Sequence, residues 1–361
     1  MKHLGDMILV INPGSTSTKV AVFEGEKCMV SKTIRHFIDD LVHYPDIISQ
    51  YEFRKDVIIG TLELENVDLS EIKIVMGRGG LTYPLKSGVY EVDNRMITHV
   101  RKGILGQHAS NLGPILAQAI AHEIKGAKAY IADPVVTDEM DELARVSGHP
   151  RFERRSIFHA LNQKAIARLH AKSLNKPYDQ LNLIVVHMGG GVSVGAHQGG
   201  RVIDVNNALD GEGPFSPERS GTLPVGQIID ACFSGNFTID EIRQMVVGEG
   251  GMVAYLFTNN MADIVNDAEK GEKKSKFYVD AFVYQVAKAI GEMATVLKGN
   301  VHAIILTGGV AYNNSIVDML KARTSFIAPI AVYPGEDEMG AMAMNARFIL
   351  SGELKPQKYP H

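Results

Sequence analysis

Two short bends rich in glycine and small hydroxyl residues interrupt apolar runs of the sequence. The segment ILVINPGSTSTKVAVF contains the first bend and VVHMGGGVSVGA the second. Peptide N–H groups in such bends can bind phosphate oxygens, and small side chains let the phosphate approach the backbone. The predicted phosphate-binding residues are Gly14, Ser15, Thr16, Ser17 and Lys19 in the first segment, and Gly189, Gly190 and Gly191 in the second.

Neither segment matches the P-loop pattern GxxxxGK[ST], which opens a helix. Lys19 follows Thr18 rather than a glycine, and the residues after Lys19 alternate as in a strand. We therefore predict that each bend joins the two strands of a β-hairpin. The alternative is a plain hairpin turn, for which glycine, serine and asparagine are ordinary residues.

A single polar residue stands at the end of the strand before each bend. This residue is Asn12 in the first segment and His187 in the second, about half the chain length apart. Asn12 could hold a metal ion or a metal-bound water, and His187 could support nucleotide phosphates. The shared plan of the two segments predicts two related lobes.

A third motif, AIILTGGVAYNN, covers residues 303–314. Gly308 and Gly309 turn the chain at the end of a buried strand, and a helix is predicted to start after Asn313. Paired glycines at such a point let a flat ring lie against the backbone, so these three residues are predicted to bind the cofactor. An ordinary strand-to-helix turn is the alternative interpretation.

The composition excludes several classes of protein. The chain has 361 residues, of which 45% are hydrophobic and 22% charged, as in a globular protein with a full core. A net charge of −4 gives no basic surface for nucleic acid, and no apolar run approaches the roughly 20 residues that cross a bilayer. Two cysteines, Cys28 and Cys232, form neither a disulfide framework nor a zinc site. We expect a cytoplasmic protein without nucleic-acid or membrane partners.

Strand-like and helix-like patterns alternate along the chain, which predicts an α/β fold. Predicted strands cover 8–11, 19–23, 72–76, 129–132, 183–186, 193–197 and 303–306. Predicted helices cover 112–125, 158–174, 278–297, 316–322 and 339–350. The glycine-, proline- and charge-rich segment SGHPRFERRS (147–156) predicts a boundary between a domain over 1–150 and a second domain over 151–335.

Three motifs resemble those of a known family. VINPGSTSTK and VHMGGGVSV are similar to the two phosphate motifs of the acetate and butyrate kinases, and LTGGVAYN is similar to their adenosine motif. The resemblance covers about residues 8–350 and is closest to butyrate and branched-chain fatty-acid kinases, through NPGSTSTK, GRGGL (77–81) and DGEGPFSPERSGTLP (210–224). The chain departs from the acetate enzymes where MGRGG stands in place of a longer His-Arg-Val-Val-His-Gly-Gly stretch.

The resemblance implies two ribonuclease-H-like lobes of the actin-like ATPase type. Each would be a mixed sheet flanked by helices, with a nucleotide cleft between the lobes and the segment 336–361 returning to the first lobe. The implied reaction is reversible phosphoryl transfer from ATP to butyrate or a branched short-chain acid, giving an acyl phosphate and ADP, with Mg²⁺ bound and a homo-oligomeric enzyme. Because a carboxylic acid with a pKa of roughly 4.3 is already an anion at neutral pH, this acceptor needs no general base. Catalysis would then come from positioning and positive charge.

Four cationic or ionisable residues carry this chemistry by resemblance. Arg78 would bind the substrate carboxylate, Arg219 would stabilise the transferring phosphoryl group, and His159 would contact that group. Ser156 is a predicted N-cap that would place His159 in the first helical turn, where the dipole favours anions. His108 is a further residue on the substrate side.

Blander interpretations remain for several basic residues. A solvated surface charge is an equally good interpretation of Arg78. Surface charges are also predicted for Arg151, Arg154 and Arg155, and structural roles for His122 and His170.

Two carboxylates resemble family acids that organise magnesium through water and position the cationic groups. Asp133 follows the strand 129–132, and Glu338 starts the last helix. With Asn12 they form the predicted metal site, in which Glu336 or Asp337 could replace Glu338. Because the substrate is already ionised, we predict that Asp133 is not an obligatory proton acceptor. A helix-terminal acid that complements the dipole is the alternative for Glu338.

Specificity would come from an apolar pocket beside Arg78, with Phe158 and Leu81 as lining residues or, alternatively, as ordinary core. Each buried methylene contributes about 0.8 kcal/mol, so butyrate could exceed acetate by roughly ten- to a hundredfold. An acetate or propionate kinase, a sugar kinase and an actin-like ATPase are the alternative functions. The sequence does not rank butyrate, isobutyrate and valerate.

Overall fold

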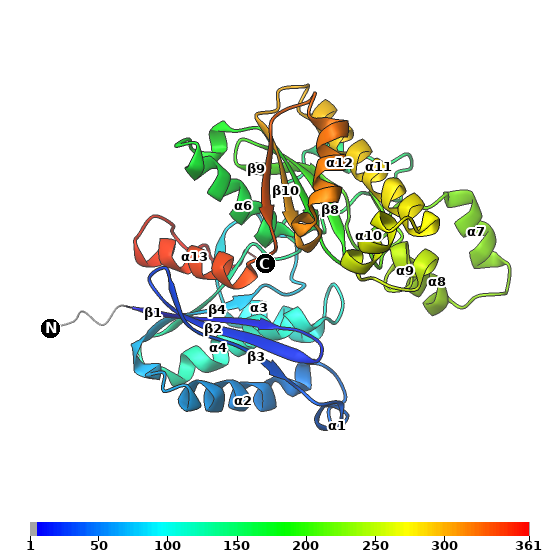
Figure 1. The fold of residues 1–361 in the computed structure, drawn as a ribbon. Helices are drawn as coiled ribbons and strands as arrows, with labels where there is room; N and C mark the ends of the chain where they lie inside the picture. The colour runs from blue at the N-terminus through cyan, green and yellow to red at the C-terminus, as the bar shows by residue number, and fades with distance from the viewer. Residues whose placement is uncertain (1–5, 361) are drawn as a thin grey trace. The chain divides into compact units, whose positions relative to one another are not determined.

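The computed structural model describes residues 6–360 and divides into two compact units (Figure 1). Unit 1 contains the chain up to Thr137 and the segment from Asp337 onward, and unit 2 contains Asp138–Glu336. The boundary thus lies before the predicted position at residue 150. The reason is that residues after Thr137 bond within unit 2: Asp141 N donates to Ile203 O at 2.9 Å.

Within its described residues, unit 1 contains a six-stranded sheet in the order β3-β2-β1-β4-β6-β5. Strands β3, β2 and β1 are antiparallel neighbours, β1, β4 and β6 are parallel, and β5 is antiparallel to β6. The strands are β1 (Met7–Pro13), β2 (Ser17–Glu24), β3 (Lys27–Arg35), β4 (Ile72–Arg78), β5 (Val89–Glu91) and β6 (Lys128–Ala132). The helices are α1 (Ile38–Leu41), α2 (Tyr51–Leu64), α3 (Asn94–Lys102), α4 (Leu112–Glu123) and α13 (Glu338–Leu350).

Helices cover both faces of this sheet. Successive strand residues point to opposite faces, so Leu9 and Ile11 pack into the cluster that includes Leu116 of α4. Ile8 and Val10 occupy the other face of β1, which is also fully buried. Figure 1 shows α2 and α4 below the sheet and α13 above it, and α13 contacts β1 and β4.

Unit 2 contains a five-stranded sheet in the order β11-β10-β7-β8-β9 within its described residues. Its strands are β7 (Leu183–Met188), β8 (Val192–Gln198), β9 (Arg201–Val205), β10 (Ala303–Gly308) and β11 (Ile330–Pro334). Its helices are α5 (Glu142–Arg145), α6 (Ala160–Ser173), α7 (Val225–Phe233), α8 (Ile239–Val246), α9 (Gly251–Leu256), α10 (Met261–Glu269), α11 (Lys273–Val296) and α12 (Asn314–Thr324).

The two faces of β7 pack into different clusters. Ile184 and Val186 join the large core that includes Val286 of α11, whereas Leu183 and Val185 pack with Ala167 of α6. Every residue of β7 is buried, which is the pattern of a central strand covered on both faces.

The two units repeat one topology. In each, two antiparallel hairpins come first (β1-β2-β3 and β7-β8-β9), and parallel strands then add beside the first strand of the unit (β4 and β6; β10 and β11). The predicted internal repeat and the predicted α/β fold with two mixed sheets are therefore confirmed.

One predicted helix boundary is wrong. The helix expected from residue 158 with Ser156 as its cap begins at Ala160, and His159 itself stands at the N-cap position, with φ −78° and ψ 61°. The His159 side chain does not cap the helix, because its ring is hydrogen-bonded to Ser193 of β8, as described below. Strands β3, β5, β9 and β11 and helices α1–α3, α5 and α7–α10 were not predicted.

Candidate functional site

The first bend of unit 1 is held from inside by a buried arginine. Arg54 of α2 is fully buried and donates to Gly14 O and Ser15 O at 2.7 Å each, and to Ser17 O at 3.3 Å. Its other bonds reach Thr18 Oγ1 at 3.2 Å and Gln50 Oε1 at 2.8 and 3.1 Å. Burial lowers the pKa of Arg54 to about 10, so the side chain stays charged at neutral pH.

These bonds set the direction of the peptide groups in the bend. In a trans peptide the C=O and the following N–H point in opposite directions. Because Gly14 O and Ser15 O point at Arg54, the N–H groups of Ser15 and Thr16 point away from it. Both residues are exposed, so the bend presents peptide donors to solvent, as an anion site requires.

A charged cluster lies beside this bend at the ends of β1 and β4. Arg78 and Glu338 form a two-pronged ion pair with both N···O distances at 2.8 Å. Asn12 Nδ2 donates to Glu338 Oε2 at 2.6 Å, and Arg78 Nη1 donates to Asn12 Oδ1 at 3.3 Å. The register pairs Ile11 with Gly77, which places Asn12 next to Arg78. The structure thus brings together three predicted residues, and Arg78 is not an isolated surface charge.

Asp133 lies one residue beyond the strand partner of Arg78. Arg78 pairs with Ala132 on β6, and the carboxylate of Asp133 accepts from Ser87 Oγ at 2.6 Å and from Gly88 N at 2.8 Å. Asp133 is buried and has φ 37°, in the left-handed region. Such strain is stored where neighbouring structure fixes the residue, which suits a positioning role.

The three adjacent acids near residue 337 have different surroundings. Glu338 contacts Arg78 and Asn12, whereas Asp337 caps α13 by accepting from Gly340 N at 2.7 Å. Glu336 belongs to unit 2, where its carboxylate lies 3.3 Å from His187 Nε2. Among the three candidates, the structure favours Glu338 beside Asn12.

The remaining predicted residues of unit 1 lie in the segment before α4 and on β2. Leu81 is half-buried, its N–H donates to Asn111 Oδ1 at 2.8 Å, and its side chain faces Gly106. His108 is exposed, and its Nδ1 accepts from Ser110 N at 3.1 Å. Lys19 is exposed on β2 opposite Asn12.

In unit 2, two imidazole rings stack beside the second bend. The rings of His159 and His187 are parallel within 10°, with centroids 3.8 Å apart. His187 is fully buried, and its Nδ1 donates to Asn162 Oδ1 at 2.9 Å. His159 Nδ1 lies 2.9 Å from Ser193 Oγ on β8. The predicted histidines are therefore brought together by α6 and the β7–β8 hairpin.

Arg219 lies against the glycines of this bend. A Cβ added to Gly191 would lie 2.3 Å from Arg219 Nη1 and 3.3 Å from His159 Cε1. Ser216 Oγ donates to Gly190 O at 2.6 Å and accepts from Arg219 N at 3.0 Å, so it fastens the loop of Arg219 to the bend. A side chain at residue 191 would therefore displace the guanidinium.

The guanidinium of Arg219 is largely enclosed. Its Nη1 donates to Ala208 O at 2.7 Å, while its buried Nε has no hydrogen-bond partner among the described residues. Burial lowers the pKa of Arg219, and the carboxylates of Glu218 and Asp210 oppose this shift. An enclosed cation with an unused donor is suited to an anionic ligand.

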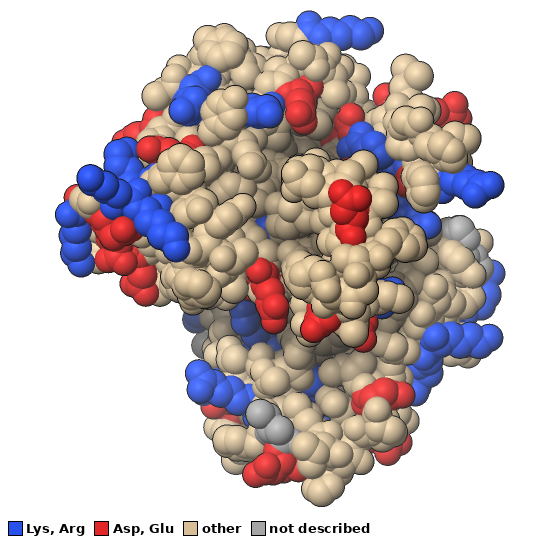
Figure 2. Space-filling view, turned by 90° about the vertical axis from the view of Figure 1, so that its right-hand side faces the viewer, with Lys and Arg blue, Asp and Glu red and all other residues tan. Residues whose placement is uncertain are grey.

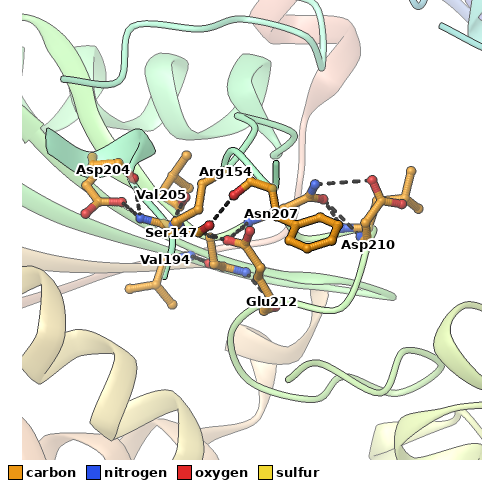
Figure 3. A network of polar contacts seen from close by, with 12 residues as sticks. Ser147, Arg154, Val194, Asp204, Val205, Asn207, Asp210 and Glu212 are labelled. Carbon is orange, nitrogen blue, oxygen red and sulfur yellow. Dashed lines mark hydrogen bonds and ion pairs between the residues drawn. The ribbon is translucent and has the colours of Figure 1, made fainter. Parts of the chain in front are cut away.

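A polar network holds the loop that bonds to Arg219 (Figure 3). Arg154 pairs with Asp204 at 3.0 Å and with Glu212 at 3.3 Å, and Glu212 also accepts from Asn207 N at 3.1 Å. Burial alone would lower the pKa of Arg154, but the two carboxylates outweigh it and raise that pKa. The prediction that Arg154 is a surface charge is therefore wrong; Arg151 and Arg155 are exposed as predicted.

The third motif reaches the end of β7. Gly308 has φ +88°, and a Cβ there would lie 2.3 Å from Met188 O, just before the second bend. Gly309 leaves open space around an added Cβ. Asn313, which was predicted to bind the cofactor, caps α12 by accepting from Ile316 N at 3.0 Å, and this confirms the predicted helix start.

Phe158, predicted to line the substrate pocket or the core, and the two histidines predicted to be structural differ in burial. Phe158 is buried with Met140, Val202 and Val205, which favours its core interpretation. His170 is buried beside Tyr333, in line with a structural role, and His122 is exposed. Sequence reasoning did not assign the supporting residues Arg54, Asn162, Gln163, Ser193 and Ser216.

On the face of the molecule that Figure 2 draws, Lys and Arg side chains are interspersed with Asp and Glu side chains. Residues 6–360 contain no group of three or more His, Cys, Asp or Glu side chains arranged to hold a metal ion. Over the same residues, none of the helices combines the length and the apolar character that a bilayer span requires.

A chain with two such units, each with a strand–bend–strand hairpin beside charged side chains, has the actin-like ATPase fold. The solved structure of Porphyromonas gingivalis acetate kinase shares this fold, with a TM-score of 0.79 at 18% identity over 96% of this chain and 100% of that one. A propionate kinase from Francisella tularensis gives a TM-score of 0.74 at 19% identity over 94% and 98% of the two chains.

Sequence similarity is more specific. Residues 151–333 match the acetokinase family. Butyrate kinase 2 of Clostridium acetobutylicum is 54% identical over 352 residues, 98% of this chain and 99% of that protein; butyrate kinase 1 of the same organism is 51% identical over the same shares. The chain belongs to the acetokinase family. It is a short-chain carboxylate kinase that uses ATP and ADP, as the resemblance of its motifs implied.

Proposed function

We propose that this kinase transfers the γ-phosphoryl group of ATP to butyrate or a branched short-chain acid, in a reversible reaction. The observation that carries the proposal is the cluster of Arg219, His159 and His187 on a glycine bend. The chain that holds this cluster is similar to a butyrate kinase over 98% of its residues. The exposed free thiols of Cys28 and Cys232 support a reducing compartment such as the cytoplasm.

Unit 2 supplies the groups that act on the phosphoryl group. The unpartnered Nε of Arg219 donates to an equatorial phosphoryl oxygen, and His159 donates to a second oxygen. The bend 189–191 and Gly308 bind the nucleotide through their backbone, and a Cβ at Gly191 or Gly308 would lie 2.3 Å from a neighbouring protein atom. Preorganised donors of this kind stabilise charge as it develops in the transition state.

Unit 1 supplies the groups that position the acid and the metal-bound phosphates. Arg78 binds the substrate carboxylate while Glu338 holds its guanidinium in one orientation. The N–H groups of Ser15 and Thr16 bind phosphate oxygens. Asp133 keeps the end of β6 in place and accepts no proton, because the substrate reaches the enzyme as a carboxylate.

Magnesium fits this arrangement through water. Asn12 and Glu338 are adjacent oxygen-bearing side chains, and Mg²⁺ commonly uses one or two carboxylates besides the phosphates of its nucleotide. Glu338, Asn12 and, less directly, Asp133 would hold the hydrated ion, which would neutralise phosphate charge when bound.

A substrate panel tests the proposal. Purified protein is assayed with ATP and acetate, propionate, butyrate, isobutyrate or valerate, and acyl phosphate is trapped with hydroxylamine. We expect kcat/KM for butyrate or isobutyrate to exceed that for acetate by roughly 10- to 100-fold, since each buried methylene contributes about 0.8 kcal/mol. Preference for acetate, or ATP turnover only with a sugar or with no acceptor, would overturn it.

Arg219→Ala provides the matching test of the site. It should lower kcat by about 10³-fold, because one preorganised donor to a developing anion contributes on that scale. Binding of ADP, followed by calorimetry, should stay near the wild-type value. Loss of ADP binding together with turnover would contradict the role assigned to Arg219.

A further inference from the structure

A chain of hydrogen bonds runs behind His159 through the interior of unit 2. Gln163 lies one turn along α6, and its Nε2 donates to Ser193 Oγ at 2.8 Å and to Ser193 O at 3.1 Å. Ser193 Oγ lies 2.9 Å from His159 Nδ1. On the other side, Gln163 Oε1 lies 2.9 Å from His197 Nε2, and His197 Nδ1 lies 2.7 Å from Tyr178 Oη. Gln163, Ser193 and His197 are fully buried.

The chemistry of the amide gives this chain one direction. Gln163 Oε1 can only accept, so His197 Nε2 carries the proton and His197 Nδ1 accepts from Tyr178. Burial, helped by the cations Lys164 and Arg168, holds the pKa of His197 far below its ordinary value, so this ring carries one proton. Gln163 Nε2 can only donate. Ser193 Oγ therefore accepts from Gln163, and its own proton is directed to His159 Nδ1.

We propose that Gln163, acting through Ser193, holds His159 in the tautomer whose proton is on Nε2. His159 then presents a hydrogen-bond donor, and not a base, to a phosphoryl oxygen. Gln163 is a positioning residue, since it acts through Ser193. The catalytic consequence rests on the proposed function, whereas the tautomer does not depend on it.

Gln163→Glu tests the proposal with almost no change of shape. A carboxylate at residue 163 accepts from both His197 Nε2 and Ser193 Oγ, so the serine hydroxyl turns and its oxygen accepts from His159 Nδ1. We expect ¹⁵N NMR of histidine-labelled protein to move the His159 proton from Nε2 to Nδ1. We also expect kcat to fall about 100-fold or more, because a wrong tautomer disables a catalytic histidine, with ADP affinity little changed.

Gln285→Glu is the matched control. Gln285 Oε1 also accepts a partly buried hydrogen bond, from Phe215 N at 3.1 Å, but Gln285 is not part of the chain of hydrogen bonds to His159. Should Gln163→Glu fail to fold, Ser193→Ala replaces it and should leave His159 as a mixture of tautomers. A proton on Nδ1 in the wild type, or no change in either variant, overturns the proposal. A shifted tautomer with unchanged kcat supports the lock and overturns instead the role of His159 in the proposed function.

Discussion

Gly191→Ala is the change whose effect follows most directly from the geometry of the second bend. The added Cβ would lie 2.3 Å from Arg219 Nη1 and 2.8 Å from Arg219 Cζ, whereas ordinary contacts begin at 3.4 Å. The guanidinium must therefore move by about 1 Å. A displacement of about 1 Å in a catalytic group can reduce turnover by about 100-fold, or about 2.7 kcal/mol in activation free energy.

The fold should tolerate this change. Gly191 does not occupy the left-handed region that only glycine adopts readily, so alanine fits its backbone. We therefore expect kcat to fall about 100-fold while the melting temperature and ADP affinity change little. Steady-state kinetics at saturating ATP and butyrate, calorimetry with ADP and thermal melting give the three readouts.

Gly291→Ala in α11 is the matched control. No heavy atom lies within 4 Å of its added Cβ, so it makes the same chemical change in the same unit without contacting Arg219. A Gly191→Ala enzyme with wild-type kcat would refute the reasoning, because the position of Arg219 would then not limit turnover. A variant that loses ADP binding would refute it differently, by assigning the glycine to the nucleotide alone.

Three further predictions concern buried ionisable side chains. Arg54→Met should destabilise the protein by about 3 kcal/mol or more, because several carbonyls lose a charged donor; urea unfolding measures this, and weaker ADP binding would show that the first bend has loosened. Burial and the neighbouring Arg54 cation lower the pKa of His36 to about 4. The unfolded chain therefore binds the extra proton first as pH falls from 6.5 to about 4, and stability should decline across that window by up to about 3 kcal/mol; a His36→Asn variant should show a smaller decline. Lys164→Met should cost about 3–5 kcal/mol by removing the fully buried ammonium that lies 2.6 Å from the Glu139 carboxylate, while Lys164→Met with Glu139→Leu should recover most of the loss, as paired unfolding curves would show.

Local patterns in the sequence predict much of the fold. The hairpins around both bends, the strand before Gly308 and the start of α12 at Asn314 were all predictable, because alternation, glycine turns and caps act between near neighbours. The exposed helices α7 and α8 were missed, since none of their side chains is buried and their apolar residues therefore give no core-facing stripe.

The supporting residues of the site could not be predicted in the same way. Arg54 reads as a surface charge on α2, yet its carbonyl partners lie 39 and 40 residues earlier in the chain. Arg154 also looks like a surface charge in the sequence, and its partner Glu212 lies 58 residues later. Gln163 becomes informative only when β8 brings Ser193 and His197 to α6. Burial of a polar group is a tertiary property, so no local signal marks it.

The placement of α13 has a consequence for how the protein is made. Unit 1 needs residues from both ends of the chain, because α13 packs on β1 and β4, whereas unit 2 is continuous from Asp138 to Glu336. During synthesis, unit 2 can therefore finish folding while unit 1 still exposes the sheet face that carries Ile8 and Val10. Unit 1 is therefore translated first but completed last. Nascent chains that are stalled before Asp337 should bind chaperones through the exposed sheet face.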